Sequence, residues 1–184
     1  MAFTDASASK PEETIIPAIA ADGSYYPIEK MEAHRSPILH LAVSVFVFDV
    51  SSGDLLIQKR AQDKYHCGGL WANTCCTHPH WDEALAASAS RRLREELGIS
   101  VILNERRVFE YCADCGNGLH EHERVTFYAG YADKKSLQVP FNDAEVADIR
   151  WVNPVALQQE LEQDAGQFAP WFQIYLREFP DLKI

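Results

Sequence analysis

Residues 71–99 constrain the fold of this chain most, because they join a compact group of reactive side chains to a predicted amphipathic helix. We expect this helix to begin at Asp82, whose carboxylate can accept hydrogen bonds from free N–H groups of the first turn. We expect it to end at Gly98, which tolerates a positive φ. Apolar residues recur every four positions and predict one buried stripe, formed by Leu85, Ala89, Leu93 and Leu97.

Charged residues occupy the other faces of the predicted helix. Arg91 with Glu95 and Arg92 with Glu96 are four residues apart, a spacing at which side chains meet on a helix. Alone, this pattern is typical of a solvated helix with surface ion pairs, which contribute little to stability. A functional interpretation is favoured by the thiols and imidazoles placed just upstream around the turn former Pro79, namely Cys75, Cys76, His78 and His80.

Composition limits the classes of partner. The chain has 184 residues, 47% of them hydrophobic and 24% charged, with a formal net charge of -10. Such a balance is ordinary for a globular protein, and its acidity argues against nucleic acid or an anionic membrane as the main partner. An anionic ligand would therefore need local cations.

The ends of the chain and its cysteines suggest a cytoplasmic protein. Residues 1–13 are polar and lack the apolar core of a secretion signal, and no later run reaches the length of a membrane span. Five cysteines in that compartment are more typical of thiols, metal ligands or nucleophiles than of disulfides. We expect residues 1–13 to form a flexible tail and residues 14–184 a single domain.

The remaining pattern predicts strands connected by turns and a few helices. A β-branched and aromatic run at 40–50 predicts a buried strand. Other strands are expected at 15–19, 25–28, 55–59, 101–104, 108–111, 119–131 and 149–152, with loops at 30–37, 60–70 and 112–118. Prolines begin two further helices, at 154–163 and 170–178. The fold class predicted from this mixture is α+β.

Two carboxylates on one strand point to a metal or a general acid. Alternate residues of a strand share a face, so Glu121 and Glu123 point the same way, and like charges this close require a cation or a shared proton. With His34, His40 and His78, the chain offers a donor set that suits Mn²⁺, Mg²⁺ or Zn²⁺. Any single histidine is more often a hydrogen-bonded structural residue.

Cys112 and Cys115 form a C-x-x-C motif that could bind zinc or act in redox chemistry. Because no second C-x-x-C accompanies it and no helix is predicted to follow it, we interpret the pair as structural or incidental.

Several motifs in order resemble type I isopentenyl diphosphate isomerase. They are H-L-A-V-S-V-F-V-F, W-A-N-T-C-C-T-H-P, R-R-L-R-E-E-L-G-I, H-E-H-E-R-V-T-F, E-V-A-D-I-R-W-V and F-A-P-W, and they cover most of the chain. The resemblance implies a Nudix-like α/β/α sandwich with a mixed sheet between helices.

The predicted central helix also resembles a Nudix box. Glu83, Arg91, Glu95, Glu96 and Gly98 have the spacing of the box. Thr77 replaces the glycine of the box, which affects the geometry of the loop. Arg92 replaces its first paired glutamate, which in Nudix hydrolases helps hold the magnesium that activates water, so an arginine here suits binding a diphosphate without cleaving it.

The resemblance implies a role for each matching residue. Cys76 and Glu123 would transfer protons with the assistance of Tyr111, and Cys76 is chosen over Cys75 because it lies two residues before the ligand histidine. The catalytic divalent ion (Mn, Mg or Zn) would be bound by His34, His40, His78, Glu121 and Glu123. Glu96 would hold a magnesium ion at the diphosphate, and the substrate would contact Lys30, Arg60, Lys64, Arg92 and Trp171.

The implied reaction moves a double bond within a five-carbon diphosphate through a tertiary carbocation. Water would trap this cation, so the site must be dry. An indole face such as that of Trp171 stabilises a cation by about 2 kcal/mol without offering a nucleophile. The diphosphate and its magnesium would be held by local cations. Metal affinity is expected to fall below about pH 6.5, since histidine ligands must be neutral.

Two other functions remain possible at this point. One is a Nudix hydrolase of a nucleoside or prenyl diphosphate, and the other is a zinc-stabilised binding module whose cysteines and histidines serve only folding. For the isomerase we expect a small prenyl diphosphate as the partner, with no nucleic acid and no membrane, and a monomer or weak dimer.

Overall fold

The computed structural model describes residues 14–182. The strands are β1 (Ile15–Ile19), β2 (Tyr25–Glu29), β3 (His40–Asp49), β4 (Leu55–Arg60), β5 (Trp71–Ala72), β6 (Cys75–Thr77), β7 (Asn104–Asp114), β8 (His120–Ala132) and β9 (Val146–Val152). The helices are α1 (Lys30–Arg35), α2 (Leu85–Leu97), α3 (Pro154–Gln163) and α4 (Pro170–Glu178), with a 3-10 turn at Ala165–Gln167. The predicted tail 1–13 lies outside the described residues, and the single domain from 14 to 184 stays a prediction.

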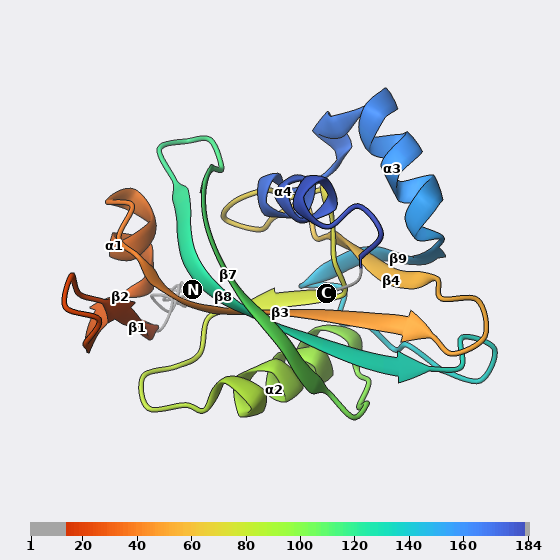
Figure 1. The fold of residues 1–184 in the computed structure, drawn as a ribbon, viewed down its shortest axis with the longest axis horizontal. Coiled ribbons are helices and arrows are strands. Elements are labelled where there is room, and N and C mark those ends of the chain that lie inside the picture. Colours follow the sequence, from red (N-terminus) through yellow and green to blue (C-terminus); the bar gives the residue numbers. More distant parts are fainter. Residues whose placement is uncertain (1–13, 183–184) are drawn as a thin grey trace, which may run out of the picture.

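Strand β3 is the centre of the mixed sheet. It pairs in parallel with β8 along its whole length, and β8 pairs in turn with the antiparallel β7 (Figure 1). The other edge of β3 is shared by three strands in succession, with β1 at His40, β6 at 43–45 and β4 at 47–48. Residues of β6 and β8 therefore face each other across β3.

Helices cover both faces of the sheet, α2 on one side and α3 with α4 on the other (Figure 1). Alternate side chains of β3 consequently enter two different hydrophobic clusters. The cluster on the α2 side contains Val43, Val45, Val47, Ala89, Leu93 and Leu97. The cluster on the α3 and α4 side contains Ala42, Phe46, Phe48, Leu157, Phe172 and Leu176.

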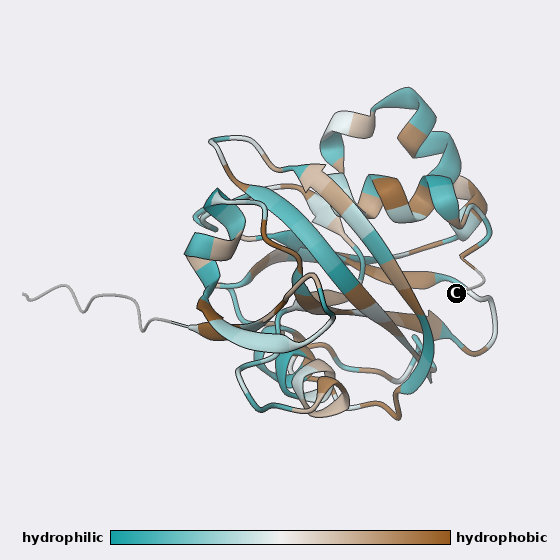
Figure 2. Cartoon of the chain, turned by 60° about the vertical axis from the view of Figure 1, so that its left-hand side comes forward, coloured by the Kyte–Doolittle hydropathy of each residue, from teal (hydrophilic) through white to brown (hydrophobic). Residues whose placement is uncertain are grey.

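This double cover explains why every residue of β3 is buried and confirms the predicted α/β/α sandwich. In Figure 2 the helices carry both hydrophilic and hydrophobic residues, as expected where one side of a helix packs on a sheet and the other meets solvent. None of the helices within residues 14–182 combines the length and the apolar character that crossing a bilayer would need.

Most predicted elements are confirmed with small shifts at their ends. These are the strands at 15–19, 25–28, 40–50, 55–59, 119–131 and 149–152, the central helix, and the helices at 154–163 and 170–178. The predicted ion pairs of α2 also form, with Arg91 Nη1 3.2 Å from Glu95 and Arg92 bonded to Glu96.

The predicted loop at 30–37 is wrong, because residues 30–35 form the short helix α1. Its first turn is capped by the Glu29 carboxylate, which accepts hydrogen bonds from the N–H groups of Met31 (2.8 Å) and Glu32 (2.9 Å). A glutamate is an uncommon cap, so sequence preference does not indicate this helix start.

The predicted cap at Asp82 is also wrong. Helix α2 begins at Leu85, and Ala84 precedes it with no side-chain cap. Asp82 instead adopts a positive φ of 65° in the turn before the helix. The other end is confirmed, since Gly98 ends the helix with a φ of 67° and a Cβ there would meet Pro140 at 2.8 Å.

The strand expected at 101–104 is wrong except for its last residue, and the strand expected at 108–111 is part of a longer strand. Strand β7 runs from Asn104 to Asp114 and includes part of the expected loop at 112–118. Its pairing with β8 shifts register between Glu105 and Arg107, and this irregularity interrupts the alternation that a sequence pattern relies on.

Candidate active site

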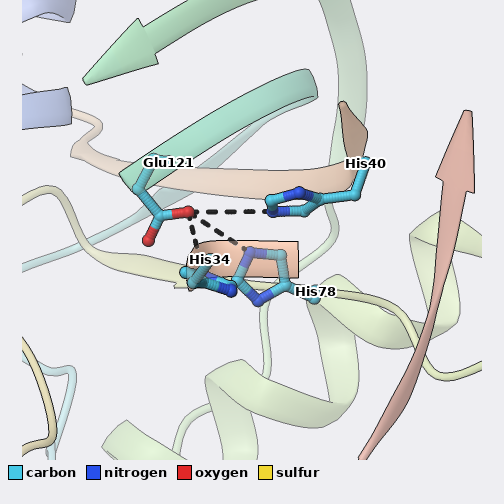
Figure 3. A group of neighbouring side chains, drawn as sticks. All are labelled: His34, His40, His78 and Glu121. Carbon is cyan, nitrogen blue, oxygen red and sulfur yellow. Dashed lines mark ion pairs between the residues drawn. The ribbon is translucent and has the colours of Figure 1, made fainter. Parts of the chain in front are cut away.

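Three histidines and one glutamate from four separate segments meet in the interior (Figure 3). His34 lies in the last turn of α1, His40 begins β3, His78 follows β6, and Glu121 lies on β8. Oε2 of Glu121 lies 3.1 Å from Nε2 of His34, 3.8 Å from Nε2 of His40 and 3.6 Å from Nε2 of His78. All four residues are buried.

The hydrogen bonds of the histidines leave acceptor atoms pointing at one another. Nδ1–H of His34 donates to the carbonyl of Lys30 (2.6 Å), and Nδ1–H of His40 donates to the carbonyl of Ile38 (2.7 Å). Each Nε2 thus keeps its lone pair. Among the described residues, neither Nε2 atom nor Oε2 of Glu121 has a hydrogen-bond donor. A divalent cation would satisfy all these buried acceptors at once, so the residues fit a metal.

Glu121 carries negative charge in this site. Burial alone would raise its pKa, but the imidazoles of His34, His40, His66 and His78 around the carboxylate hold the pKa of Glu121 well below its usual range.

His66 was missed by the sequence analysis. Its Nε2 lies 2.7 Å from Oε1 of Glu121. It sits in the irregular segment between β4 and β5, where no periodicity marks a residue as buried.

Glu123 lies two residues further along β8 and points the same way, as the alternation predicted. Both of its oxygens are engaged. Tyr111 donates from its hydroxyl to Oε2 (2.6 Å), and Nε2 of His78 lies 2.9 Å from Oε1. Burial raises the pKa of Tyr111 well above its usual value, so its hydroxyl remains a donor.

Cys76 lies on the other side of β3 from Glu123. Its Sγ donates to Oδ1 of Asn73 (3.0 Å) and lies 3.2 Å from Oγ of Ser44. Burial raises the pKa of Cys76 to about 12, so the group is a thiol at neutral pH. Cys75 points to the opposite face and packs in the cluster beneath α2, as expected for its neighbour in a strand.

A cavity of about 440 Å³ joins these groups. Cys76 and Glu123 both line it. Of the residues to which the resemblance gives a role in catalysis, metal binding or substrate binding, all but His34 and His40 line it: Lys30, Arg60, Lys64, Cys76, His78, Arg92, Glu96, Tyr111, Glu121, Glu123 and Trp171. His34 and His40 complete the buried cluster beside it.

Two cations of the cavity, Lys64 and Arg92, contact one carboxylate that the sequence pattern did not indicate. Glu145 lies 3.0 Å from Nη2 of Arg92 and contacts Nζ of Lys64. Burial alone would raise the pKa of Glu145, but these two cations lower it below its usual value.

Lys30 has its Nζ 4.9 Å from the ring centre of Tyr65, and burial lowers the pKa of Lys30 to about 8.

Glu96 is buried behind Arg92. Its carboxylate accepts from Nε2 of Gln58 (2.7 Å) and from Arg92. Within residues 14–182 it belongs to neither of the two groups of converging ligand atoms, so a magnesium ion at Glu96 stays a prediction.

Trp171 lies on α4 with only 3% of its surface exposed. The guanidinium of Arg60 lies over its ring, 5.2 Å from the centre. Trp171 thus reaches the cavity from the helical layer as well as packing in the core.

The C-x-x-C motif does not form a site of its own. Cys112 is exposed, whereas Cys115 turns inward toward Cys67 and His66. Its two cysteines therefore have different surroundings.

Comparison with known sequences identifies relatives over most of the chain. Residues 38–172 match the NUDIX domain family. The chain is 46% identical over 162 residues to a protein of Jannaschia sp. (strain CCS1), covering 88% of this chain and 90% of the relative. It is 49% identical over 158 residues to one of Dinoroseobacter shibae, covering 85% and 88%. Both relatives are named isopentenyl-diphosphate Delta-isomerase.

Solved structures share the fold at low sequence identity. The protein DR0079 from Deinococcus radiodurans superposes with a TM-score of 0.70 at 15% identity, covering 89% of this chain and 98% of the other. A MutT NUDIX hydrolase from Burkholderia pseudomallei gives a TM-score of 0.56 at 20% identity, covering 77% and 98%. These similarities support the fold alone.

Proposed function

This chain belongs to the NUDIX domain family and, within it, to the family of isopentenyl-diphosphate Delta-isomerases, and on this premise we propose that it interconverts isopentenyl diphosphate and dimethylallyl diphosphate. The observation that carries the proposal is that Cys76 and Glu123, on strands either side of β3, line the same cavity. One proton must be added to the alkene and another removed nearby, so two proton-transfer groups must reach one substrate.

Cys76 and Glu123 act as the acid–base pair in this proposal. The raised pKa of Cys76 keeps a proton on sulfur, and Tyr111 and His78 hold the two oxygens of Glu123 in position. Because the reaction is reversible, each group donates in one direction and accepts in the other.

The diphosphate would bind to the cations of the same cavity. Lys30, Arg60, Lys64 and Arg92 line it and supply the local positive charge that the acidic chain needs. Glu145 forms ion pairs with Lys64 and Arg92, so the incoming phosphate oxygens would compete with this carboxylate for both cations.

The hydrocarbon end would lie against the indole of Trp171. An aromatic face stabilises a developing tertiary cation by about 2 kcal/mol and cannot trap it as water would. The buried position of Trp171 supports this role.

His34, His40, His78, Glu121 and Glu123 would hold a divalent ion beside the acid–base pair, and Glu96 would take part in binding a second ion at the diphosphate. When bound, the first ion supplies positive charge that fixes the orientation and the charge of these carboxylates. The donor set of three imidazoles with carboxylates fits Mn²⁺ or Zn²⁺ as well as Mg²⁺.

Hydrolysis of a diphosphate is the alternative reaction for this fold. The position of the first paired glutamate of the box is occupied by Arg92, whose guanidinium binds Glu95, Glu96 and Glu145. A guanidinium cannot coordinate a metal, so the ion that activates water in hydrolysis would lack one carboxylate ligand here, which supports isomerisation over hydrolysis.

The deciding experiment incubates the purified protein with isopentenyl diphosphate, Mg²⁺ and Mn²⁺ in deuterated water and follows the mixture by NMR. We expect dimethylallyl methyl signals with deuterium incorporated, and no such signals with Cys76→Ala. Release of monophosphate or phosphate without isomerisation would indicate a hydrolase. Stabilisation by metal with neither reaction would indicate a zinc-stabilised binding module.

A further inference from the structure

A second cluster of ligand atoms lies next to the cavity but outside the set described above. A ring nitrogen of His66 and the sulfurs of Cys67 and Cys115 all lie within 4.8 Å of one another. His66 and Cys67 come from the segment between β4 and β5, and Cys115 comes from the turn that joins β7 to β8. Cys67 takes a positive φ of 53°, a conformation uncommon outside glycine and asparagine.

The imidazole of His66 is arranged as that of a metal ligand. Nε2 lies 2.7 Å from Oε1 of Glu121 and so donates its proton to this carboxylate. Nδ1 then carries the lone pair. It is buried, and within residues 14–182 nothing donates a hydrogen bond to it. A histidine whose other ring nitrogen donates to a carboxylate is the usual form of a metal-binding imidazole.

We propose that Nδ1 of His66 and the sulfurs of Cys67 and Cys115 bind one thiophilic divalent cation, best matched by Zn²⁺. Two sulfurs and one imidazole nitrogen are a zinc donor set, and the fourth tetrahedral position is left to a water molecule. On binding, each thiol releases one proton to solvent while both sulfurs and the metal keep their oxidation states.

A disulfide between the two cysteines is the competing interpretation. It would use both sulfurs but would leave the buried Nδ1 of His66 without a partner. A metal ion satisfies all three atoms, so the observations favour the metal.

The proposed ion would cross-link two segments of the chain, one of which lines the cavity. It would tie residues 61–70, which hold Lys64 and follow Arg60, to the turn between β7 and β8. Glu121 would then connect two metal centres, because its Oε2 faces His34, His40 and His78 while its Oε1 binds His66. This role does not depend on the reaction proposed for the cavity.

The test uses Co²⁺ alone as the probe, added to the reduced full-length protein under nitrogen. Cobalt bound to thiolates gives an intense sulfur-to-metal charge-transfer band in the near ultraviolet, which histidine and carboxylate ligands do not give. We expect this band in the native protein and its loss in Cys67→Ser and Cys115→Ser. Cys112→Ser is the matched control, since it removes an exposed cysteine three residues away, and it should keep the band.

Three further measurements separate this site from its surroundings. Cys76→Ser should keep the band, because Cys76 lies near the other cluster. His66→Ala should weaken Zn²⁺ binding by at least about 10-fold. Zn²⁺ should also slow hydrogen exchange in residues 61–70 of the native protein but not of Cys115→Ser, with circular dichroism showing that both are folded.

The proposal would be overturned by a native protein without the band, or by a band that survives in Cys67→Ser. Loss of the band in Cys112→Ser or Cys76→Ser would assign the thiolate to another site and would also overturn it. Mass spectrometry that finds a Cys67–Cys115 disulfide in the reduced protein before metal is added would do the same.

Discussion

The hydroxyl of Tyr111 donates a 2.6 Å hydrogen bond to Oε2 of Glu123, and the two residues face each other across the β7–β8 pairing. The same register brings the Tyr111 side chain to the cavity, although most of β7 is more exposed. A hydrogen bond to a charged group typically contributes about 1.5–3 kcal/mol. The Tyr111 hydroxyl is therefore positioned to orient Glu123.

Replacing Tyr111 by Phe should remove this hydrogen bond while keeping the aromatic ring. We expect kcat for isomerisation to fall by about 10- to 100-fold with little change in KM, because the lost interaction orients Glu123, the proposed proton-transfer group. Tyr128→Phe is a suitable control, since the Tyr128 hydroxyl contacts Glu105 at 3.4 Å away from the cavity. An unchanged kcat in Tyr111→Phe would exclude this role.

The adjacent cysteines should respond differently to substitution. Cys76→Ala removes a proposed proton-transfer group and should lower kcat by at least about 100-fold without unfolding the protein. Cys75→Ala removes sulfur from the core beneath α2, so it should lower the free energy of unfolding by about 0.5–3 kcal/mol and keep most turnover. Steady-state kinetics and urea unfolding of both variants test this difference. Equal losses of activity would contradict the choice of Cys76 over Cys75 as the proton-transfer residue.

Metal bound by the histidine cluster should stabilise the fold. Mn²⁺ at about 100 times its Kd should raise the free energy of unfolding by about 2.7 kcal/mol, and a chelator should reverse the effect. His34→Ala should abolish this response, whereas His122→Ala should keep it, because His122 points away from Glu121 and donates to the carbonyl of Pro37 (2.9 Å). Thermal unfolding of each variant with and without Mn²⁺ measures this stabilisation. If Mn²⁺ stabilises His34→Ala as much as the native protein, the ion binds elsewhere.

The burial of Lys30 predicts a pH dependence of substrate capture. Because its pKa is lowered to about 8, Lys30 is a cation below this pH and neutral above it. Electrostatic attraction to the diphosphate is thus present at low pH and lost as pH rises. We expect kcat/KM to fall above about pH 8, and Lys30→Arg to shift this fall to higher pH because arginine stays charged.

Lys59→Arg serves as the control for this profile. Lys59 lies over Trp71 at 6.0 Å and does not line the cavity. Its profile should match that of the native protein. If Lys30→Arg also leaves the pH dependence of kcat/KM unchanged, a group other than Lys30 must cause the fall above about pH 8.

Local patterns were sufficient to predict much of the framework. The apolar stripe of α2, the prolines that begin α3 and α4, and the alternation that turns Glu121 and Glu123 inward are all found in the structure. Each depends on the period with which side chains of a helix or strand return to the same face, and this period can be recognised from a few consecutive residues.

Where the local signal was unusual, prediction was wrong. Helix α1 begins at a glutamate cap, α2 begins three residues after Asp82, and β7 contains a register shift. His66 and Glu145 lie outside helices and strands, so nothing in their neighbourhood marks them as part of the site. Their contacts come from segments distant in the chain, His66 to Glu121 and Glu145 to Arg92.

The order of residues alone determined which side chains point inward on the regular elements and, through resemblance, which chemistry we propose for them. Tertiary structure decided how these elements meet: β3 pairs with β8 so that His40 lies beside Glu123, and with β6 so that Ser44 lies beside Cys76. The distinction has a physical reason. Side-chain direction follows from local backbone geometry, whereas convergence of distant groups depends on strand register and on packing over the whole core.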